Sequence, residues 1–244
     1  MKRLTIDIGN SRAKLTVFHR DEPLEETLTD NRALASLPEL LTKHDISACI
    51  TSSVIELPEE TERMLERLPF PSLRLSPETR LPLVSILYRT PETLGTDRIA
   101  AVVGAVSRLP GRDILVIDAG TCITYDFVDQ RGQYLGGNIS PGLRLRLEAM
   151  HSGTSRLPLV NPYEGETPAL GYDTETALRS GAARGIRHEM EGYIRELRAK
   201  YPSLAVFLTG GERFDLHSSA KSATFADRYL VARGLNKILE YNTK

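Results

Sequence analysis

One short pattern that occurs twice constrains the fold of this chain more than any other feature. Residues 4–10 read LTIDIGN and residues 115–121 read LVIDAGT, so an apolar predicted strand runs into Asp-x-Gly in both places. Each copy is followed by a second predicted strand and lies near the start of a segment of similar size. One Asp-x-Gly is common by chance, whereas two copies in the same structural context are typical of a duplicated fold. We therefore predict an α/β protein of two similar lobes, residues 1–111 and residues 112–244.

The repeated turn has the chemistry that a phosphate group requires. Glycine lets the backbone turn sharply and approach a ligand closely, and Asn10, Ser11 and Thr121 offer hydrogen-bond donors beside it. An aspartate at the end of the strand can hold Mg2+, a metal-bound water or a monovalent cation. Because phosphoryl transfer needs mainly positioning and charge neutralisation, two such turns are chemically sufficient for it.

A third predicted strand ends in a turn at Gly210 and Gly211. In actin-like ATPases and sugar kinases a turn of this kind lies beside the adenosine, although an ordinary tight turn fits these residues equally well. The chain contains neither the P-loop pattern G-x-x-x-x-G-K-[ST] nor the dinucleotide pattern G-x-G-x-x-G. The fold class that we predict is the duplicated, two-lobed ribonuclease H-like fold of the actin, sugar-kinase and Hsp70 ATPase type.

Apolar periodicity and turn residues predict the other elements of the chain. Strands are expected at residues 4–9, 13–18, 47–53, 113–117, 123–128, 134–139 and 204–209. Helices are expected at residues 31–44, 58–68, 99–108, 174–200 and 227–241. A further helix is expected to begin at Ser140 as its N-cap, with Pro141 as its first residue. Five prolines between residues 69 and 91 favour extended loops and short edge strands there.

Composition and the pattern at the N-terminus bear on where the protein works and on its partners, and we expect a cytoplasmic protein. The 244 residues are 41% hydrophobic and 26% charged, and the formal net charge of -1 gives no electrostatic reason to expect nucleic acid or an anionic membrane as a partner. No stretch approaches the roughly 20 apolar residues that span a bilayer. Asp7 lies where a secretion signal has its apolar core. The two cysteines and five histidines lack the spacing of a zinc site.

Taken together, the motifs resemble those of type III pantothenate kinases. The segments that carry the resemblance are residues 7–11 (DIGNS), 95–98 (GTDR), 118–121 (DAGT), 136–142 (GGNISPG) and 174–181. They occur in the order and spacing of that family over almost the whole chain. The resemblance implies ATP-dependent phosphorylation of pantothenate to 4'-phosphopantothenate, the first step of coenzyme A biosynthesis. It also implies a homodimer with substrate bound near the dimer interface, and a need for Mg2+ and for a monovalent cation, K+ or NH4+.

The resemblance implies roles for individual residues as well. Asp97 matches the catalytic base, since a carboxylate there can accept the proton of the primary hydroxyl of the substrate. The substrate-binding positions of the family correspond to Tyr88, Gly95, Thr96, Asp97, Arg98 and Thr174. The nucleotide-binding positions correspond to Ile6, Asp7, Ile8, Gly9, Asn10, Ser11, Arg12, Ala13 and Thr121. Arg98 suits a bidentate contact with the pantothenate carboxylate. Asp118 corresponds to the ligand of the monovalent cation, and Asp7 to an acidic anchor for Mg2+.

Other interpretations of these residues stay open on the sequence alone. Asp97 also suits a helix N-cap or a salt bridge to the next residue, Tyr88 suits core packing, and Thr174 suits a helix cap. Arg144 and Arg146 either reach phosphate or face solvent, and the charged helix pattern favours solvent.

The chain departs from the family pattern at two places. Ser11 stands where threonine is usual, which keeps the hydroxyl, and Cys122 with Ile123 replaces a small Ala-Thr pair, which bears on packing and cation affinity. Two other functions are compatible with the fold: another small-molecule kinase of the same superfamily, or a non-catalytic, nucleotide-dependent regulator. The GTDR segment and the region around Thr174 favour pantothenate, and the intact Asp97 favours catalysis.

Overall fold

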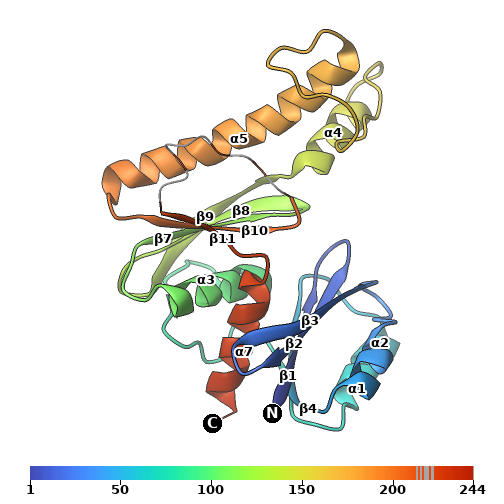
Figure 1. Cartoon of the computed structure of the whole chain (residues 1–244), viewed down its shortest axis with the longest axis vertical. Coiled ribbons are helices and arrows are strands. Elements are labelled where there is room, and N and C mark those ends of the chain that lie inside the picture. Colours follow the sequence, from blue (N-terminus) through green and yellow to red (C-terminus); the bar gives the residue numbers. More distant parts are fainter. Residues whose placement is uncertain (213, 215, 217–219, 221–222, 244) are drawn as a thin grey trace. The chain divides into compact units, whose positions relative to one another are not determined.

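The computed structural model describes residues 1–212, 214, 216, 220 and 223–243, and alternates strands with helices (Figure 1). The strands are β1 (Lys2–Ile8), β2 (Ala13–His19), β3 (Glu22–Thr29), β4 (Ile46–Ser53), β5 (Ser72–Arg74), β6 (Ser85–Ile86), β7 (Ile114–Ala119), β8 (Cys122–Val128), β9 (Gln133–Pro141), β10 (Ala205–Gly210) and β11 (Thr224–Ala226). The helices are α1 (Leu37–Lys43), α2 (Glu59–Glu66), α3 (Thr96–Arg108), α4 (Leu143–Ser152), α5 (Thr174–Lys200) and α7 (Leu230–Asn242), with a short 3-10 helix at Pro91–Thr93. Among the described residues, no helix has the length and hydropathy that crossing a membrane requires.

Two sheets repeat one strand order. The first sheet runs β3-β2-β1-β4-β5, and the second runs β11-β10-β7-β8-β9-β6. When β7 takes the role of β1, the second sheet has the order of the first and adds β6 beside β9. In the first sheet β1 pairs antiparallel with β2 and parallel with β4. The two Asp-x-Gly turns therefore follow the corresponding central strands, β1 and β7, which confirms the predicted duplicated α/β fold.

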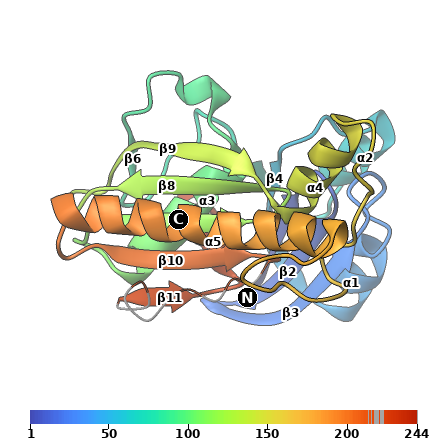
Figure 2. The same ribbon diagram turned by 90° about the horizontal axis from the view of Figure 1, so that it is seen from above.

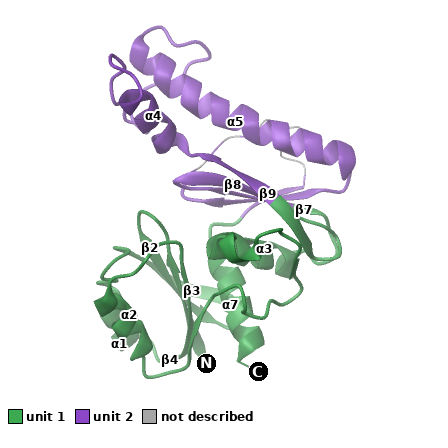
Figure 3. Cartoon of the chain, turned by 180° about the vertical axis from the view of Figure 1, so that it is seen from behind, with its two compact units in different colours: residues 1–114, 126–136, 227–244 green, residues 115–125, 137–226 purple. Residues whose placement is uncertain are grey.

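The chain divides into two compact units, each built from segments that are distant in sequence (Figure 3). Unit 1 comprises residues 1–114, 126–136 and 227–244, and unit 2 comprises residues 115–125 and 137–226. Strands β7, β8 and β9 have residues in both units. The predicted lobes, residues 1–111 and 112–244, describe the repeat of strand and turn and stay a prediction.

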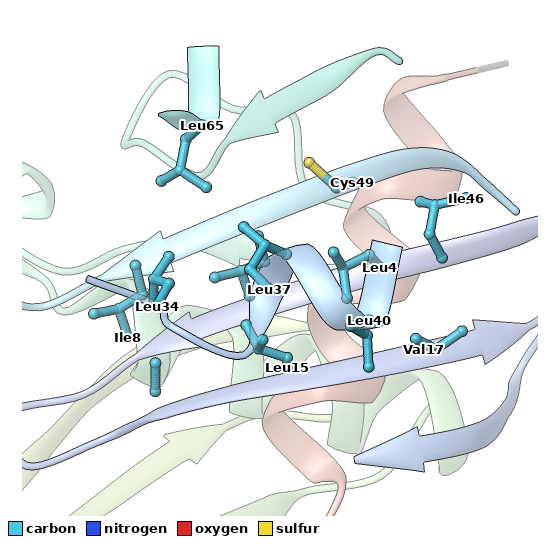
Figure 4. Packing of buried hydrophobic residues seen from close by; sticks show 12 residues of the cluster. Leu4, Ile8, Leu15, Val17, Leu34, Leu37, Leu40, Ile46, Cys49 and Leu65 are labelled. Atoms are coloured by element: carbon cyan, nitrogen blue, oxygen red, sulfur yellow. The ribbon is translucent and has the colours of Figure 1, made fainter. Parts of the chain in front are cut away.

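Strand β1 of unit 1 is covered on both faces. On one face Leu4 and Ile8 lie in a cluster with Leu37 of α1 and Leu65 of α2 (Figure 4). On the other face α7 packs against β1 and β4. Even the intervening Thr5 is fully buried. Because both faces are covered, the strand buries a polar side chain at Thr5 as well as its apolar ones, although its sequence alternates from Leu4 to Ile8.

Helices α3 and α7 of unit 1 approach each other closely at two glycines. A Cβ atom at Gly104 would lie 2.3 Å from the carbonyl oxygen of Leu230, and one at Gly234 would lie 1.8 Å from the carbonyl oxygen of Ala100. Any side chain at either position would force the two backbones apart. The position of α3, whose first turn carries residues 96–98, therefore depends on α7.

Helix α5 gives unit 2 its apolar layer above the sheet. Its buried residues include Leu178, Ala182, Ile186, Met190 and Ile194, which recur every four residues. This spacing forms one apolar stripe along the helix. Figure 2 shows α5 lying along the sheet over β8 and β10. The 27-residue helix has the bounds predicted from the sequence, Thr174–Lys200.

The predicted start of α4 is wrong. The helix begins at Leu143 with Gly142 as its N-cap, and β9 continues through Ser140 and Pro141. A backbone hydrogen bond explains the difference, because the Gly142 N–H donates to the Thr121 carbonyl at 3.0 Å. This bond holds the segment extended against the second Asp-x-Gly turn, and the helix can start only after it.

Residues 31–36, predicted as the start of a helix, form turns instead, and α1 begins at Leu37. The Asp30 carboxylate accepts hydrogen bonds from the backbone N–H groups of Arg32, Ala33 and Ala35. These bonds, led by those from Ala35 and Ala33, lower the pKa of Asp30 to about 2. A side chain that binds the backbone in this way competes with helix formation.

Candidate active site

The first Asp-x-Gly turn joins β1 to β2 and is closed by backbone hydrogen bonding. The Gly9 N–H donates to the Arg12 carbonyl at 3.0 Å. Residues 10–12 are exposed, whereas Ile8 and Ala13 on either side of the turn are buried and paired. Two fixed strands thus present a short polar segment, with its backbone, to solvent.

Asn31, a residue outside the predicted site, supports this turn. Its side-chain nitrogen Nδ2 donates to the Gly9 carbonyl at 2.9 Å and to the Asn10 carbonyl at 2.8 Å. One side chain thereby fixes two peptide groups of the turn. No local pattern in the sequence links Asn31 to the turn, since the partners are 22 and 21 positions apart.

Asp7 is half-buried near the end of β1, in register with Lys14 of β2 and Ser52 of β4. Ser52 is fully buried, and its hydroxyl donates to Thr96 Oγ1 at 2.8 Å. The Thr96 hydroxyl in turn donates to the Ser53 carbonyl at 3.4 Å. The strand beside Asp7 is therefore bonded directly to the first turn of α3, and Thr96 is a link between the two predicted motifs.

The first turn of α3 holds Asp97 in a fixed position. Gly95 is the N-cap, and a Cβ atom there would lie 2.5 Å from Asp97 Oδ1, so the carboxylate occupies space that only a glycine leaves free. Asp97 Oδ1 accepts a hydrogen bond from the Arg98 backbone N–H at 2.8 Å. Asp97 is therefore not the N-cap, which was one of the interpretations left open by the sequence.

The electrostatic surroundings of Asp97 make its carboxylate more basic. Burial raises the pKa of Asp97 above its ordinary value, and the nearby Asp126 carboxylate raises it further. The hydrogen bond from the Arg98 backbone and the charge of its guanidinium oppose this shift without cancelling it. A half-buried carboxylate with a raised pKa is the kind of group that can act as a general base.

Two residues that the sequence analysis did not identify hold Arg98: Asp126 of β8 and Tyr134 of β9. Arg98 Nε donates to Asp126 Oδ1 at 2.9 Å, and Arg98 Nη2 donates to the Tyr134 hydroxyl at 3.0 Å. The Tyr134 hydroxyl donates to the same Asp126 oxygen at 2.7 Å. The exposed fraction is 7% for the Arg98 side chain and 0% for that of Asp126. The ionic partner of Arg98 is therefore Asp126, and not Asp97.

Tyr88 borders this cluster. It is half-buried, and its ring meets the Tyr134 ring edge-on at a centroid distance of 5.9 Å. Tyr88 thus packs against a member of the Arg98 cluster. Because the ring is only half-buried, it can both pack there and contact a substrate.

The second Asp-x-Gly turn, residues 118–121, is confined by two glycines of unit 2. A Cβ atom at Gly142 would lie 2.3 Å from the Gly120 carbonyl oxygen. A Cβ atom at Gly210, whose φ is +101°, would lie 2.3 Å from the Ala119 carbonyl oxygen. The diglycine segment that begins at Gly210 therefore touches the second turn, and its left-handed backbone explains the choice of glycine.

Three other predicted residues belong to unit 2. Asp118 is half-buried near the end of β7, and Thr121 is exposed between β7 and β8. Thr174 is the exposed first residue of α5 and is not its cap. The N-cap is Asp173, whose carboxylate accepts a hydrogen bond from the Thr176 N–H at 2.8 Å.

Arg146 differs from its expected solvent-facing position, whereas Arg144 is exposed as predicted. The Arg146 side chain is 21% exposed and pairs with Glu189 of α5. The hydroxyls of Ser140 and Tyr125 donate to the other oxygen of the same carboxylate, at 2.5 and 2.8 Å. Arg146 therefore belongs to a polar cluster that joins α4, α5 and the sheet strands of unit 2.

The carboxylate beside each turn is a possible ligand for a cation that also binds the phosphates of a nucleotide. Within the described parts of the chain, no group of three or more His, Cys, Asp or Glu side chains is arranged to hold a metal ion. Asp7 and Asp118 each stand near a strand end beside an exposed turn. Mg2+ commonly binds through one or two carboxylates together with substrate phosphates and waters. One carboxylate beside each turn therefore offers the oxygen donors of a hard cation that also binds phosphate and water.

Unit 1 gathers most of the predicted residues, and it adds others that the sequence did not reveal. The residues that were missed are Asn31, Ser52, Asp126 and Tyr134. Only Asp126 leaves a signal in the sequence, because a carboxylate inside the apolar strand β8 (CITYDFV) indicates a buried ion pair. A buried serine or tyrosine is too common to indicate a partner by itself.

Comparison with known proteins identifies the family to which this sequence is similar. Residues 3–196 match the model of the family described as type III pantothenate kinase. A type III pantothenate kinase from Bacteroides fragilis (strain YCH46) is 54% identical over 239 residues, which cover 98% of both chains.

Two solved structures share the fold at low sequence identity. One is a Campylobacter jejuni protein described as a conserved Baf family transcriptional activator, with a TM-score of 0.60, 23% identity and 98% of both chains covered. The other is a Listeria monocytogenes protein described as an N-acetylmannosamine kinase, with a TM-score of 0.57, 14% identity and 100% of both chains covered. These similarities show the fold alone, which is that of sugar kinases. The family model and the Bacteroides relative show more: this chain belongs to the type III pantothenate kinase family.

Proposed function

We propose that this enzyme transfers the γ-phosphoryl group of ATP to the primary hydroxyl of pantothenate and so makes 4'-phosphopantothenate, the first step of coenzyme A biosynthesis. Family membership supports the substrate and the reaction. One structural observation supports the chemistry most directly: the half-buried carboxylate of Asp97 stands beside Thr96, which is hydrogen-bonded to Ser52 on the strand next to Asp7. The base and the first phosphate turn are thereby anchored to the same strand pair.

In this proposal Asp97 accepts the proton of the attacking hydroxyl. The hydroxyl oxygen forms a bond to the γ-phosphorus, the bond from that phosphorus to the bridging oxygen breaks, and ADP leaves with the electron pair. The proton of the hydroxyl passes to the Asp97 carboxylate. The raised pKa of Asp97 favours this transfer, because a more basic carboxylate holds the proton more strongly.

Pantothenate is bound by Tyr88, Gly95, Thr96, Asp97, Arg98 and Thr174 in this proposal. Arg98 Nε and Nη2 already donate to Asp126 and Tyr134. Among the described residues, Nη1 donates to no partner. A single contact from Nη1 to the pantothenate carboxylate therefore fits this geometry better than the bidentate contact expected from the sequence.

ATP is bound by residues 6–13 and Thr121 in this proposal, through backbone N–H groups and small polar side chains of the two turns. Mg2+ at Asp7 would neutralise phosphate charge when bound, and K+ or NH4+ would bind at Asp118. Asn31 supports the site by fixing the carbonyls of Gly9 and Asn10. Both substrates are small and water-soluble, and a location in the cytoplasm belongs to the same proposal.

We also propose a homodimer in which the region before α5 lies at the interface. This region exposes large apolar side chains, with exposed fractions of 86% for Leu170 and 69% for Tyr172. Exposed apolar side chains that gather in one segment are typical of an interaction surface. Thr174 follows directly, so a dimer would cover a proposed substrate contact. Light scattering should give twice the mass of one chain, and Leu170→Asp should shift it towards one chain.

The test of the function is an assay of ADP release from ATP and pantothenate with Mg2+, run with K+ and then with Na+ alone. Turnover that requires pantothenate, with 4'-phosphopantothenate identified by mass, is the expected result. Stimulation by K+ that is lost in Asp118→Asn would support the cation role. Folded protein that binds ATP but shows no pantothenate-dependent turnover under either condition would overturn the proposal and direct the search to a different small substrate.

A further inference from the structure

We propose that Asp126 and Tyr134 are positioning residues of the phosphoryl-transfer reaction, which hold the Arg98 guanidinium and through it the first turn of α3 that carries Asp97. This inference rests on the proposed function. It concerns residues of β8 and β9 that no sequence motif singles out, and it follows from how their polar atoms are bonded.

The three side chains form a closed triangle of hydrogen bonds. Arg98 donates to both partners, at 2.9 Å to Asp126 and at 3.0 Å to Tyr134, and Tyr134 donates to Asp126 at 2.7 Å. Each side chain therefore restrains the other two. Since Arg98 follows Asp97 in the chain and its backbone N–H donates to the Asp97 carboxylate, a fixed guanidinium also restrains the turn that holds the base.

The Asp126 carboxylate is bonded in an uneven way that a purely structural ion pair does not need. Oδ1 accepts two hydrogen bonds of the triangle, from Arg98 Nε and from the Tyr134 hydroxyl, and Arg98 Nη2 lies 2.7 Å from the same oxygen. Oδ2 is buried and has no hydrogen-bond partner among the described residues. An ion pair optimised for stability would share both oxygens with the guanidinium in a bidentate pair. A bare buried oxygen costs free energy, and a cost of this kind is expected where function maintains the geometry.

The uneven bonding leaves the negative charge of Asp126 incompletely compensated beside Asp97. The charged groups that face Asp97 are Arg98 on its own helix and Asp126 on β8. The groups that face Arg98 are Asp126, Tyr134 on β9 and Tyr88 before α3. Two carboxylates thus flank one guanidinium. The charge of Asp126 makes Asp97 a stronger base, and its bond to Arg98 keeps the guanidinium from forming an ion pair with Asp97 that would weaken it.

The closing experiment compares two tyrosine variants that lose one hydroxyl each. Tyr134→Phe removes the hydroxyl that accepts from Arg98 Nη2 and donates to Asp126. It keeps the ion pair between Arg98 and Asp126. Tyr125→Phe is the matched control, because Tyr125 is equally a sheet tyrosine with a hydroxyl bonded to a carboxylate, that of Glu189. We expect Tyr134→Phe to lower kcat about tenfold with KM for ATP unchanged, and Tyr125→Phe to leave both constants unchanged.

A second variant tests the effect on the base. In Asp126→Asn the neutral amide no longer raises the pKa of Asp97, so the acid limb of the kcat/KM profile should move to lower pH while the plateau falls. This shift separates positioning from mere structure, because a loss of stability lowers the melting temperature without moving the limb. If Asp126→Asn does not fold, Tyr134→Phe decides the question.

The outcomes of this experiment are distinct from those that test the proposed function. Wild-type protein without pantothenate-dependent turnover would overturn the function itself. Active wild-type protein, with Tyr134→Phe matching its kcat or with Asp126→Asn keeping its acid limb, would overturn the positioning role and leave the function standing.

Discussion

Unit 1 and unit 2 each contain a tyrosine, a carboxylate and an arginine joined by hydrogen bonds, and the two clusters differ in their access to water. In unit 1 the exposed fractions are 0% for Asp126 and 7% for Arg98. In unit 2 they are 26% for Glu189 and 21% for Arg146. A buried charge that loses its partner cannot be hydrated, whereas a partly exposed one can. Loss of one partner should therefore destabilise the cluster of unit 1 more than the cluster of unit 2.

The clusters also differ in how the carboxylate is used. Glu189 accepts from Tyr125 and Ser140 on one oxygen and from Arg146 on the other, so both oxygens are satisfied. Within the described part of the chain, Asp126 accepts hydrogen bonds on one oxygen only. The cluster of unit 2 has the bonding of a structural link between helices and sheet. In the cluster of unit 1 a buried carboxylate oxygen lacks a hydrogen bond, and it lies next to the proposed base. Such a costly arrangement is expected at a catalytic site.

The largest effect on stability should come from removing the buried carboxylate. Asp126→Ala leaves the Arg98 guanidinium unpaired inside unit 1 and should lower the free energy of unfolding by about 3–5 kcal/mol. Glu189→Ala, the matched variant of unit 2, should cost about 1 kcal/mol because water can reach Arg146. Urea denaturation of both variants checks the difference. Equal losses would mean that burial does not distinguish the clusters.

Removing the proposed base should separate activity from stability. Asp97→Asn should lower kcat by roughly 10²–10⁴-fold, the usual contribution of a general base. It should also raise the melting temperature near neutral pH. Burial raises the pKa of Asp97, so the folded state holds the ionised carboxylate at a cost that the amide does not have. Calorimetry at neutral pH and well below pH 3.8, where the carboxylate is protonated in both states, should show the gain only at neutral pH. An unchanged melting temperature would count against a strained Asp97.

Glu189 should show the opposite dependence on pH. Burial tends to raise its pKa, but the hydrogen bonds from Ser140, Arg146 and Tyr125 outweigh burial and hold the pKa below its ordinary value. The stability that Glu189 contributes is therefore present above pH 4.5, the ordinary value, and is lost as pH falls through the lower value of the folded state. Glu189→Gln should be less stable than wild type by about 0.5–1 kcal/mol at neutral pH and equal to it in acid. A difference that persists in acid would assign the loss to packing.

Salt should produce the smallest difference between the clusters. Raising ionic strength from about 0.1 M to 1 M shortens the Debye length from about 10 Å to about 3 Å and screens exposed charges first. The destabilisation caused by Glu189→Gln should shrink by a few tenths of a kcal/mol, while that caused by Asp126→Ala should not change. Denaturation curves at the two salt concentrations provide the measurement. Equal sensitivity would show that water reaches Asp126.

Sequence reasoning succeeded where the information is local or repeated. Helix α5 was predicted with its bounds because its apolar stripe is long and Asp173 begins it clearly. The repeated Asp-x-Gly predicted the duplication that the sheet order confirms. Strand β3 (EPLEETLT) was missed because an edge strand with a mostly solvated surface has little apolar pattern.

The candidate site was only partly predictable, for a different reason. Gly95 and Asp97 could be located from a local motif, and their roles stay a proposal. The bonds of Arg98 to Asp126 and Tyr134 join residues 28 and 36 positions apart, so they exist only once β8 and β9 have assembled beside α3. Both strands were predicted, but the pattern of a strand does not say which helix its polar residues will meet.

The contact of α3 with α7 has a consequence for how the enzyme is made in the cell. Gly104 of α3 packs against the backbone of Gly234 and Leu230, so the helix that carries Asp97 needs a partner translated long after it. A ribosome adds about 5–20 residues per second, and during that delay α3 emerges with its apolar face uncovered. Unit 2 consists of segments that are all translated before α7, and it can begin to fold first. Catalytic competence should therefore appear late in synthesis, and nascent chains stalled before Leu230 should depend on chaperones and expose Asp97 to solvent.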